Sequence, residues 1–158
     1  MDLELVGKVA AVVGGSGGIG AAVARVLAEE GCDVALTYRG STEGAERTAA
    51  DVRARGRRAW ALPLDLGRPE SVHAAAGALA DAAGELDVLV LNAGQNIVTP
   101  FDRITVEEWQ HVLQVNLSGV FFTLQALAPR IRDGGCVVTV ASVAAATGAP
   151  HHMHYAAA

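Results

Sequence analysis

Short apolar runs alternate along the chain with longer segments in which apolar residues recur at helical spacing. The runs are rich in Val, Leu and Ala and lack polar alternation, which is typical of strands covered on both faces. We predict strands at Val9–Val13, Val34–Thr37, Ala59–Leu62, Val88–Leu91 and Val137–Val140. We predict helices at Gly18–Glu30, Thr42–Arg55, Pro69–Ala83 and Thr105–Arg132.

Residues with known preferences for helix ends stand at several of these boundaries. Gly31 and Gly56 follow the first two helices, where glycine commonly terminates the helix. Pro69 suits a first helical turn. Thr105 and Glu108 have the spacing of a capping box. These signals support the boundaries that the periodicity predicts.

The strict alternation of strand and helix predicts an α/β fold with parallel strands joined by right-handed crossovers. We expect a doubly wound, Rossmann-type sheet with strand order 3-2-1-4-5. No repeat, low-complexity tract or linker interrupts the sequence, so we predict a single domain over residues 1–158.

The turn between the first strand and the first helix is dense in glycine. Glycine lacks a Cβ, so the backbone can approach a bulky ligand closely. The unpaired N–H groups at the positive end of the helix favour a phosphate. We therefore predict a dinucleotide site here. Its predicted cofactor-binding residues in this turn are Gly14, Ser16, Gly18, Ile19 and Gly20.

The residues after the second strand indicate which dinucleotide is bound. An acidic residue here accepts a hydrogen bond from the ribose 2′-hydroxyl and indicates NAD. Residues 37–42 contain no carboxylate, whereas Arg39 offers a guanidinium suited to a phosphate, which favours NADP(H) over NAD(H). Alternatively, Arg39 is a surface residue and the hydroxyls of Ser41 or Thr42 hold the ribose.

The segment after the third strand contributes Asp65 and Leu66 to the predicted cofactor site. Asp65 is placed to reach the adenine edge, and it can equally serve as a turn residue before the helix at Pro69.

Composition and charge exclude some classes of protein. Hydrophobic residues make up 51% and charged residues 18%, which is a globular profile. The net charge of −5 argues against nucleic acid as a partner, since its binding needs a basic surface. We interpret the cluster Arg53, Arg55, Arg57 and Arg58 as solvent-facing cations at a helix end. No run of about 18 apolar residues occurs and Met1–Glu4 lacks a basic start, so we predict no membrane span and a cytoplasmic location.

Two sets of residues invite a metal or disulfide interpretation. Cys32 and Cys136 lie far apart in apolar contexts, and we predict buried, reduced thiols. His151, His152 and His154 are crowded together, but no carboxylate or cysteine is nearby in sequence. We expect these histidines to line a substrate cleft and predict no metal site.

Five features in order resemble the short-chain dehydrogenase/reductase family, from Lys8 to the end of the sequence. They are the glycine motif Val13–Gly20, the loop Leu91–Gly94, the helical segment Val115–Gly119, Ser142, and Tyr155 thirteen residues later. Each is weak alone, whereas their joint order and spacing are specific. The segments are most similar to the branch that resembles 3-oxoacyl-(acyl carrier protein) reductases.

The resemblance implies a catalytic set made of Asn116, Ser142 and Tyr155. In the family, the tyrosine donates a proton to the carbonyl oxygen, and a lysine four residues later lowers the phenol pKa from about 10. The serine polarises the carbonyl, and the asparagine supports a water relay. Taken singly, these residues also fit a helix-interior asparagine, a turn serine and a half-buried aromatic. The resemblance also assigns Asn92, Ala93 and Gly94 to the cofactor.

The sequence departs from the family pattern in two motifs and at its end. Val13 replaces a threonine and Leu91 replaces an asparagine, and we hypothesise that these two apolar side chains pack together. The sequence ends at Ala158, one residue before the position of the family's lysine. We therefore expect a C-terminally incomplete fold whose fifth strand leaves an uncovered apolar edge.

These observations predict an NADP(H)-dependent oxidoreductase that interconverts a ketone and a secondary alcohol, with a 3-oxoacyl thioester as the leading substrate. The alternative is an inactive nucleotide-binding module. The resemblance further implies a small-molecule or acyl-thioester substrate and a homo-oligomer, either tetramer or dimer, for the complete protein. The charge and the lack of a long apolar run predict no nucleic acid or membrane partner.

Overall fold

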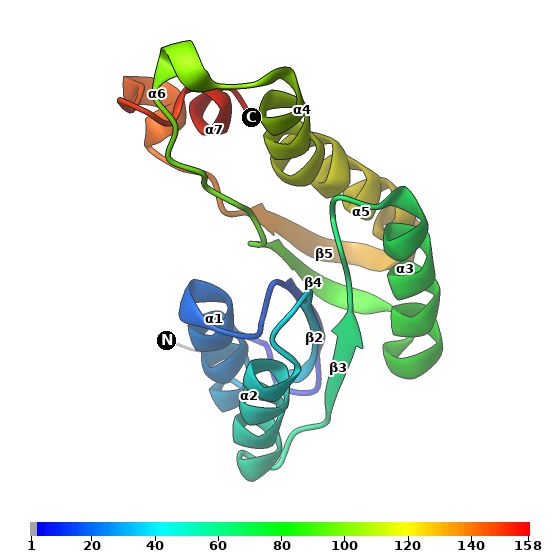
Figure 1. Cartoon of the computed structure of the whole chain (residues 1–158). Coiled ribbons are helices and arrows are strands. Elements are labelled where there is room, and N and C mark those ends of the chain that lie inside the picture. The colour runs from blue at the N-terminus through cyan, green and yellow to red at the C-terminus, as the bar shows by residue number, and fades with distance from the viewer. Residues whose placement is uncertain (1–2) are drawn as a thin grey trace.

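Five parallel strands form one sheet through the centre of the molecule, in the order β3-β2-β1-β4-β5 (Figure 1). The computed structural model describes residues 3–158. The order confirms the predicted doubly wound topology. The strands are β1 Val9–Val13, β2 Asp33–Tyr38, β3 Ala59–Pro63, β4 Leu86–Leu91 and β5 Ile131–Thr139.

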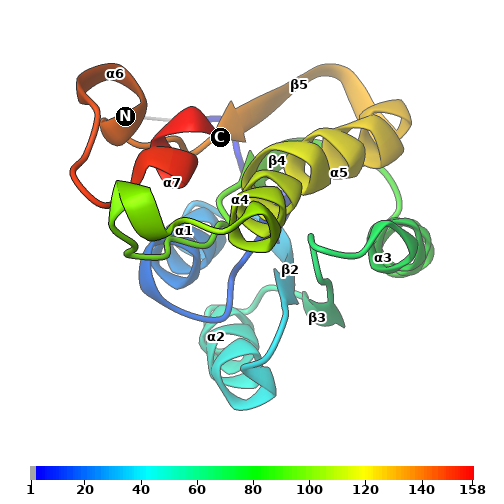
Figure 2. The same ribbon diagram turned by 45° about the horizontal axis from the view of Figure 1, so that its top comes forward.

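Helices cover both faces of the sheet, with α1 and α2 on one side and α3 and α5 on the other (Figure 2). Alternate side chains of β1 divide between the two faces, because successive residues of a strand point in opposite directions. Val13 belongs to the cluster beneath α3 and α5, and Val12 to the cluster beneath α1. The helices are α1 Gly18–Glu29, α2 Thr42–Ala54, α3 Pro69–Ala83, η1 Phe101–Arg103, α4 Val106–Leu113, the π-helical turn η2 Gln114–Ser118, α5 Gly119–Leu127, η3 Ala128–Arg130, α6 Ala144–Thr147 and α7 Met153–Ala157.

The predicted helix ends are largely confirmed. Gly31 and Gly56 adopt φ values of 96° and 75°, the left-handed conformation that glycine supplies at a helix terminus. Thr105 Oγ1 accepts a hydrogen bond from the Glu108 N–H at 3.1 Å, as a cap should.

The long helix predicted over Thr105–Arg132 is wrong in two respects. It contains the π-helical turn η2, and it ends in the short η3, so that β5 begins at Ile131. Pro129 lies in η3 and has no N–H to continue an α-helix. β5 pairs with β4 at Ile131 and again from Cys136, and the irregular stretch between them includes Gly134 at φ 80°.

The helical stretch Val106–Arg130 is long and apolar enough to cross a membrane by length and composition, with a mean hydropathy of 1.3. One such helix is weak evidence for a span, and polar residues interrupt the stretch, so the predicted absence of a continuous run of about 18 apolar residues holds. A core helix of a soluble protein passes the same test, and Val112, Val115 and Leu127 of this stretch are buried. One side of the stretch packs on α3 over the sheet, and 28% of its apolar window is buried.

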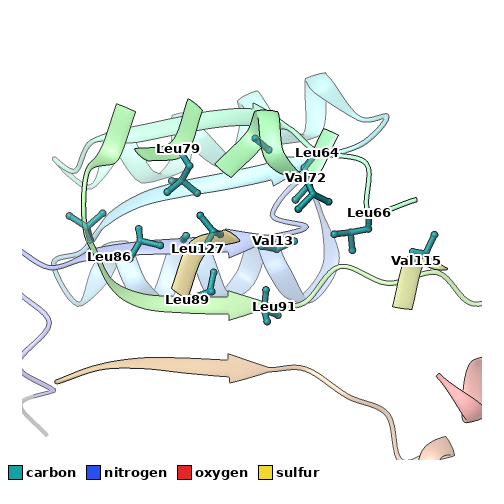
Figure 3. Packing of buried hydrophobic residues seen from close by; sticks show 14 residues of the cluster. Val13, Leu64, Leu66, Val72, Leu79, Leu86, Leu89, Leu91, Val115 and Leu127 are labelled. Carbon is teal, nitrogen blue, oxygen red and sulfur yellow. The ribbon is translucent and has the colours of Figure 1, made fainter. Parts of the chain in front are cut away.

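The two apolar replacements in the family motifs lie side by side at the centre of the sheet. Val13 and Leu91 are register partners on β1 and β4. Both are at most 3% exposed and belong to the same buried cluster (Figure 3). The arrangement agrees with the hypothesis that these side chains pack together.

The outer strand β5 leaves apolar side chains exposed, as expected for an uncovered edge. Val137 is 41% exposed and Val138 is 48% exposed. Cys136 on this strand is also exposed, which corrects the prediction that both thiols are buried. Cys32 is buried as predicted, and burial, with the nearby Asp87 carboxylate, raises the pKa of its thiol to about 11.

The predicted basic cluster at the end of α2 is engaged in ion pairs. Arg57 Nη2 and Arg58 Nε lie 3.1 and 2.7 Å from the carboxylate of Asp33 at the start of β2. Arg55 pairs with Glu29 of α1 at 2.6 Å. These arginines therefore join the ends of α1, α2 and β2, which agrees with their interpretation as cations at a helix end.

Two buried carboxylates, Asp33 and Asp87, stand near the amino ends of the central strands. Burial alone would raise the pKa of Asp33, but hydrogen bonds from the backbone N–H and guanidinium of Arg58 outweigh burial and lower it. Burial alone would likewise raise the pKa of Asp87, but the Val9 N–H at 2.8 Å and the Lys8 ammonium at 3.3 Å outweigh burial and lower it.

Acid should therefore destabilise the protein through these two groups. A carboxyl group whose pKa is lower in the folded than in the unfolded state stabilises the folded protein fully at pH values above its unfolded-state pKa, which is near 3.8 here. That contribution is lost as the pH falls through the pKa of the folded state. We expect urea unfolding to show a free energy that declines below about pH 4. The double variant Asp33→Asn/Asp87→Asn should be less stable at pH 7 and show a flatter decline; an equally steep decline would contradict this assignment.

Candidate functional site

Two hollows lie along the carboxyl ends of the strands and share Asn92, Ala93 and Gly94. The first, of about 390 Å³, runs from the glycine turn to the end of β2. The second, of about 470 Å³, runs from the start of α1 to α7. They adjoin each other at the loop after β4, and we call the two together the strand-end cleft. It lies where ligands bind in open parallel sheets.

The strand-end cleft gathers most of the predicted site residues. Twelve of them line it: Gly14, Ser16, Ile19, Arg39, Asp65, Leu66, Asn92, Ala93, Gly94, Asn116, Ser142 and Tyr155. The other two, Gly18 and Gly20, do not line it. Gly18 begins α1 with φ 51°, and Gly20 is buried behind the turn.

Two glycines of the turn are required by close packing. A Cβ on Gly14 would lie 2.8 Å from the Cβ of Ala93, and the residue has φ 84°. A Cβ on Gly20 would lie 2.0 Å from the Gly14 carbonyl oxygen and 2.7 Å from Asn92 Nδ2. These contacts bring α1 against the loop after β4, and the Gly17 N-cap has no side-chain hydrogen bond to the helix. The first N–H groups of α1 are therefore left for an anion.

Asn92 and Thr37 connect the glycine turn to its neighbouring strands. Asn92 Nδ2 donates to the Gly14 carbonyl oxygen at 3.1 Å. Thr37 Oγ1 accepts from the Gly14 N–H at 3.1 Å, and the Thr37 carbonyl accepts from the Gly15 N–H at 2.8 Å. The turn is thus held from both β2 and β4.

One end of the strand-end cleft is basic and hydroxyl-bearing. Exposed Arg39 lines it together with Ser41, whose Oγ also caps α2 by accepting from the Gly44 N–H at 3.2 Å. Across from them, Asp65 Oδ1 accepts from the Gly67 N–H at 2.9 Å. Asp65 therefore lines the cleft and serves as a turn residue, so both of its predicted roles are compatible with the structure.

Asn116 lies in η2 and clamps the loop after β4. Its Oδ1 accepts from the Gln95 N–H at 2.7 Å, and its Nδ2 donates to the Gln95 carbonyl at 2.8 Å. Asn116 thus lies within a helical stretch and is bonded to the carbonyl of a neighbouring loop, which fits its alternative role as a helix-interior asparagine. π-Helical turns occur frequently at functional sites.

Ser142 and Tyr155 line the same half of the strand-end cleft, beyond the carboxyl ends of β4 and β5. Ser142 Oγ accepts from the Ala144 N–H at 3.2 Å, which is the turn contact foreseen as its alternative role. Tyr155 is half-buried on α7, and Ile19 of α1 lines this half as well. The phenol-bearing residue therefore faces the same cleft as the glycine turn.

The prediction that the three histidines line a substrate cleft is wrong, since none lines either half of the strand-end cleft. His151 is exposed, and His152 Nδ1 lies 2.7 Å from Asn96 Oδ1. His154 is fully buried, with Nε2 3.0 Å from Glu108 Oε1 on α4. A helix turns successive residues by about 100°, so His154 faces α4 while Tyr155 faces the cleft.

Sequence reasoning missed Gln95, which lines the cleft between its basic end and the asparagine clamp. Its position directly after the Leu91–Gly94 motif was the available signal. It also missed the lining role of Thr37, Leu64 and Val115.

The fold is a doubly wound, Rossmann-like α/β sheet with a cleft at its strand ends, and comparison with known proteins identifies its family. The sequence model of a family described as short chain dehydrogenase matches residues 8–158. The chain belongs to the short-chain dehydrogenase/reductase family, and its homologues are oxidoreductases of the NAD(P)-dependent dehydrogenase class.

The similar proteins include enzymes of different names. A 3beta-hydroxysteroid dehydrogenase 1 of Eggerthella lenta is 37% identical over 157 residues, covering 98% of this chain and 60% of the relative. The 3-oxoacyl-[acyl-carrier-protein] reductase FabG of Staphylococcus aureus is 36% identical over 152 residues, covering 95% and 62%. The chain thus spans about 60% of the length of these curated relatives.

A solved structure with a bound cofactor is also similar. The short chain dehydrogenase from Burkholderia cenocepacia J2315 in complex with NADP has a TM-score of 0.92 and 42% identity, covering 97% of this chain and 63% of that one.

Proposed function

We propose that this chain forms the cofactor-binding and proton-transfer part of an NADP(H)-dependent oxidoreductase that interconverts a ketone and a secondary alcohol. The single observation that carries the proposal is the strand-end cleft, in which Arg39 lines one half and Ser142 and Tyr155 line the other. A dinucleotide is an elongated ligand with a phosphate-bearing adenosine at one end and its reactive ring at the other, and this cleft has matching chemistry at its two ends.

The residues present fit such a cofactor. Cβ atoms at Gly14 or Gly20 would collide with neighbouring atoms, so the turn is built for close approach of backbone to ligand. The uncapped start of α1 offers N–H groups to a pyrophosphate. Arg39 and Ser41 would hold the adenosine ribose and its phosphate, with Asp65 at the adenine edge.

The bound cofactor would supply or accept the hydride at the carbonyl carbon. Ser142 would donate a hydrogen bond to the carbonyl oxygen and so stabilise the negative charge that develops there. Tyr155 would donate a proton to that oxygen during reduction and accept one during oxidation. Asn116 would act through its clamp on Gln95, which fixes the loop between the two halves of the cleft.

A free phenol with a pKa of about 10 is a poor acid and base at neutral pH, and a nearby ammonium improves it. Lys8 is the one lysine of the sequence, and it pairs with Asp87 at 3.3 Å near the start of β1. Within residues 3–158, no lysine therefore lies beside Tyr155. The second candidate function is a nucleotide-binding module without turnover.

For the substrate, we propose a 3-oxoacyl thioester. The support is the similarity to the 3-oxoacyl-[acyl-carrier-protein] reductase of Staphylococcus aureus. The similarity to a 3beta-hydroxysteroid dehydrogenase makes a cyclic ketone the control substrate.

Binding and turnover separate the two candidates. NADPH should bind the 158-residue chain, as followed by enhanced cofactor fluorescence. Mass spectrometry of the protein purified from its natural source tells whether it is 16.2 kDa or larger. NADPH oxidation by that protein with a 3-oxoacyl thioester supports the oxidoreductase. Binding without turnover of either substrate supports the module, and absence of binding contradicts both.

The phosphate assignment of Arg39 predicts a change of cofactor preference. Arg39→Asp removes a cation from the adenosine end and introduces a carboxylate that repels a 2′-phosphate and accepts from a 2′-hydroxyl. We expect the ratio of NADPH to NADH affinity to fall by about 100-fold, since charged hydrogen bonds contribute about 1.5–3 kcal/mol. The matched control Arg103→Asp changes an exposed arginine of η1 outside the cleft and should leave the ratio unchanged. Equal NADPH affinity after Arg39→Asp would refute the assignment.

A further inference from the structure

Gln95 joins two positively chargeable side chains at the edge of the strand-end cleft. Its Oε1 accepts a hydrogen bond from Arg39 Nη1 at 3.2 Å. The same oxygen lies 2.9 Å from Nε2 of His111 on α4. Gln95 therefore connects the end of β2 with α4 across the loop that follows β4.

The chemistry of the partners determines how the Gln95 amide is oriented. A guanidinium only donates hydrogen bonds, so it must face the amide oxygen rather than the amide nitrogen. His111 shares that oxygen, so its Nε2 must carry a hydrogen in this arrangement. Two donors thus converge on one neutral acceptor, which restricts where Arg39 points.

The backbone of Gln95 is held as firmly as its side chain. Its N–H and its carbonyl are both bonded to the side chain of Asn116, at 2.7 and 2.8 Å. A Cβ on the preceding residue, Gly94, would lie 2.9 Å from Asn116 Oδ1, so the loop packs tightly on this asparagine. A half-buried side chain on an anchored backbone is a suitable support for a long, exposed arginine.

We propose that Gln95 is a positioning residue that orients Arg39 toward the 2′-phosphate of the cofactor while leaving its charge unneutralised. The proposal rests on the proposed function, since it deepens the specificity of the adenosine end. An amide oxygen occupies one of the five guanidinium N–H donors and leaves the others for a phosphate. A carboxylate at the same position would form a salt bridge with Arg39 and compete with the phosphate for it.

This reasoning separates Gln95 from a residue that merely fills space. Gln95→Glu keeps the size of the side chain and adds a negative charge beside Arg39. Gln95→Met keeps the length and removes the acceptor without adding charge. If positioning and neutrality both matter, both variants must weaken recognition of the 2′-phosphate, and Gln95→Glu must weaken it more than Gln95→Met.

The test measures adenosine 2′,5′-bisphosphate and adenosine 5′-monophosphate binding to the 158-residue chain by calorimetry. These probes differ by the 2′-phosphate, so the ratio of their affinities reports its recognition alone. We expect Gln95→Glu to lower this ratio about tenfold and Gln95→Met about threefold, with adenosine 5′-monophosphate affinity unchanged. The matched control is Gln110→Glu, which adds the same charge at an exposed position of α4 outside the strand-end cleft. It should change the ratio less than twofold, because solvent screens an exposed charge.

The outcomes are distinguishable. A wild-type chain that favours the bisphosphate, with a ratio lowered by Gln95→Glu and Gln95→Met but not by Gln110→Glu, supports the proposal. An unchanged ratio in Gln95→Glu, or equal losses in Gln95→Glu and Gln110→Glu, overturns it while leaving the dinucleotide site intact. Failure of the wild-type chain to bind either probe overturns this proposal and the proposed function together. Circular dichroism verifies that each variant is folded. If Gln95→Glu does not fold, the affinity ratio of Gln95→Met decides the outcome.

Discussion

Gly20→Ala is expected to destabilise the protein by about 3 kcal/mol or more and to lower NADPH affinity at least tenfold. Helix propensity alone predicts the opposite, since alanine is favoured over glycine inside a helix by about 1 kcal/mol. Packing decides the sign of the change in stability, because the new Cβ would lie 2.0 Å from the Gly14 carbonyl oxygen. That oxygen belongs to backbone and also accepts from Asn92, so α1 or the turn must move.

Gly77→Ala is the matched control for this prediction. Gly77 lies in α3, and nothing stands within 4 Å of a Cβ added there. This variant should be slightly more stable than wild type in urea unfolding, by up to about 1 kcal/mol, and should bind NADPH normally. A Gly20→Ala protein as stable as Gly77→Ala would show that the turn can relax, and the close-approach argument would fail.

Tyr155→Phe is expected to lower turnover about 10³-fold while NADPH affinity changes less than twofold. The substitution removes only the phenolic oxygen, and general acid–base catalysis by a positioned group typically contributes factors of this size. The ring stays, so the packing of α7 should persist. Stopped-flow or steady-state NADPH oxidation by the purified source protein, with a parallel fluorescence titration of cofactor binding, provides both quantities.

Two results of that experiment would contradict the assignment. Turnover that survives Tyr155→Phe would show that another group delivers the proton. Loss of cofactor binding together with turnover would show that the residue supports the fold rather than the chemistry. Ser142→Ala serves as a companion variant, since it removes the proposed polarising hydroxyl of the same half of the cleft and should also lower turnover without lowering NADPH affinity.

The sheet could be predicted from sequence because its strands are short apolar runs between strong helix-end signals. Pro69 begins α3, and Gly31 and Gly56 follow α1 and α2, as local chemistry requires. The strand order followed from the alternation of elements. The π-helical turn was not predicted, because the spacing of apolar residues indicates a helix here without distinguishing a π-helical turn within it.

The candidate site was predictable where function is carried by motifs and unpredictable where it depends on burial. The glycine turn and the positions of Ser142 and Tyr155 followed from order and spacing. The histidines did not, because which side of a five-residue helix faces a neighbour is a tertiary property. Likewise, Cys136 is apolar in its sequence context but lies on a strand that nothing covers in the described residues.

The buried contact between His154 and Glu108 couples the stability of α7, which carries Tyr155, to that of α4. In the described part of the chain, α7 contacts chiefly α4 and α6. Asn116 stands on the continuation of α4. Local unfolding of α4 would therefore displace Tyr155 and Asn116 together. We expect such an enzyme to lose activity over a narrow temperature range rather than gradually.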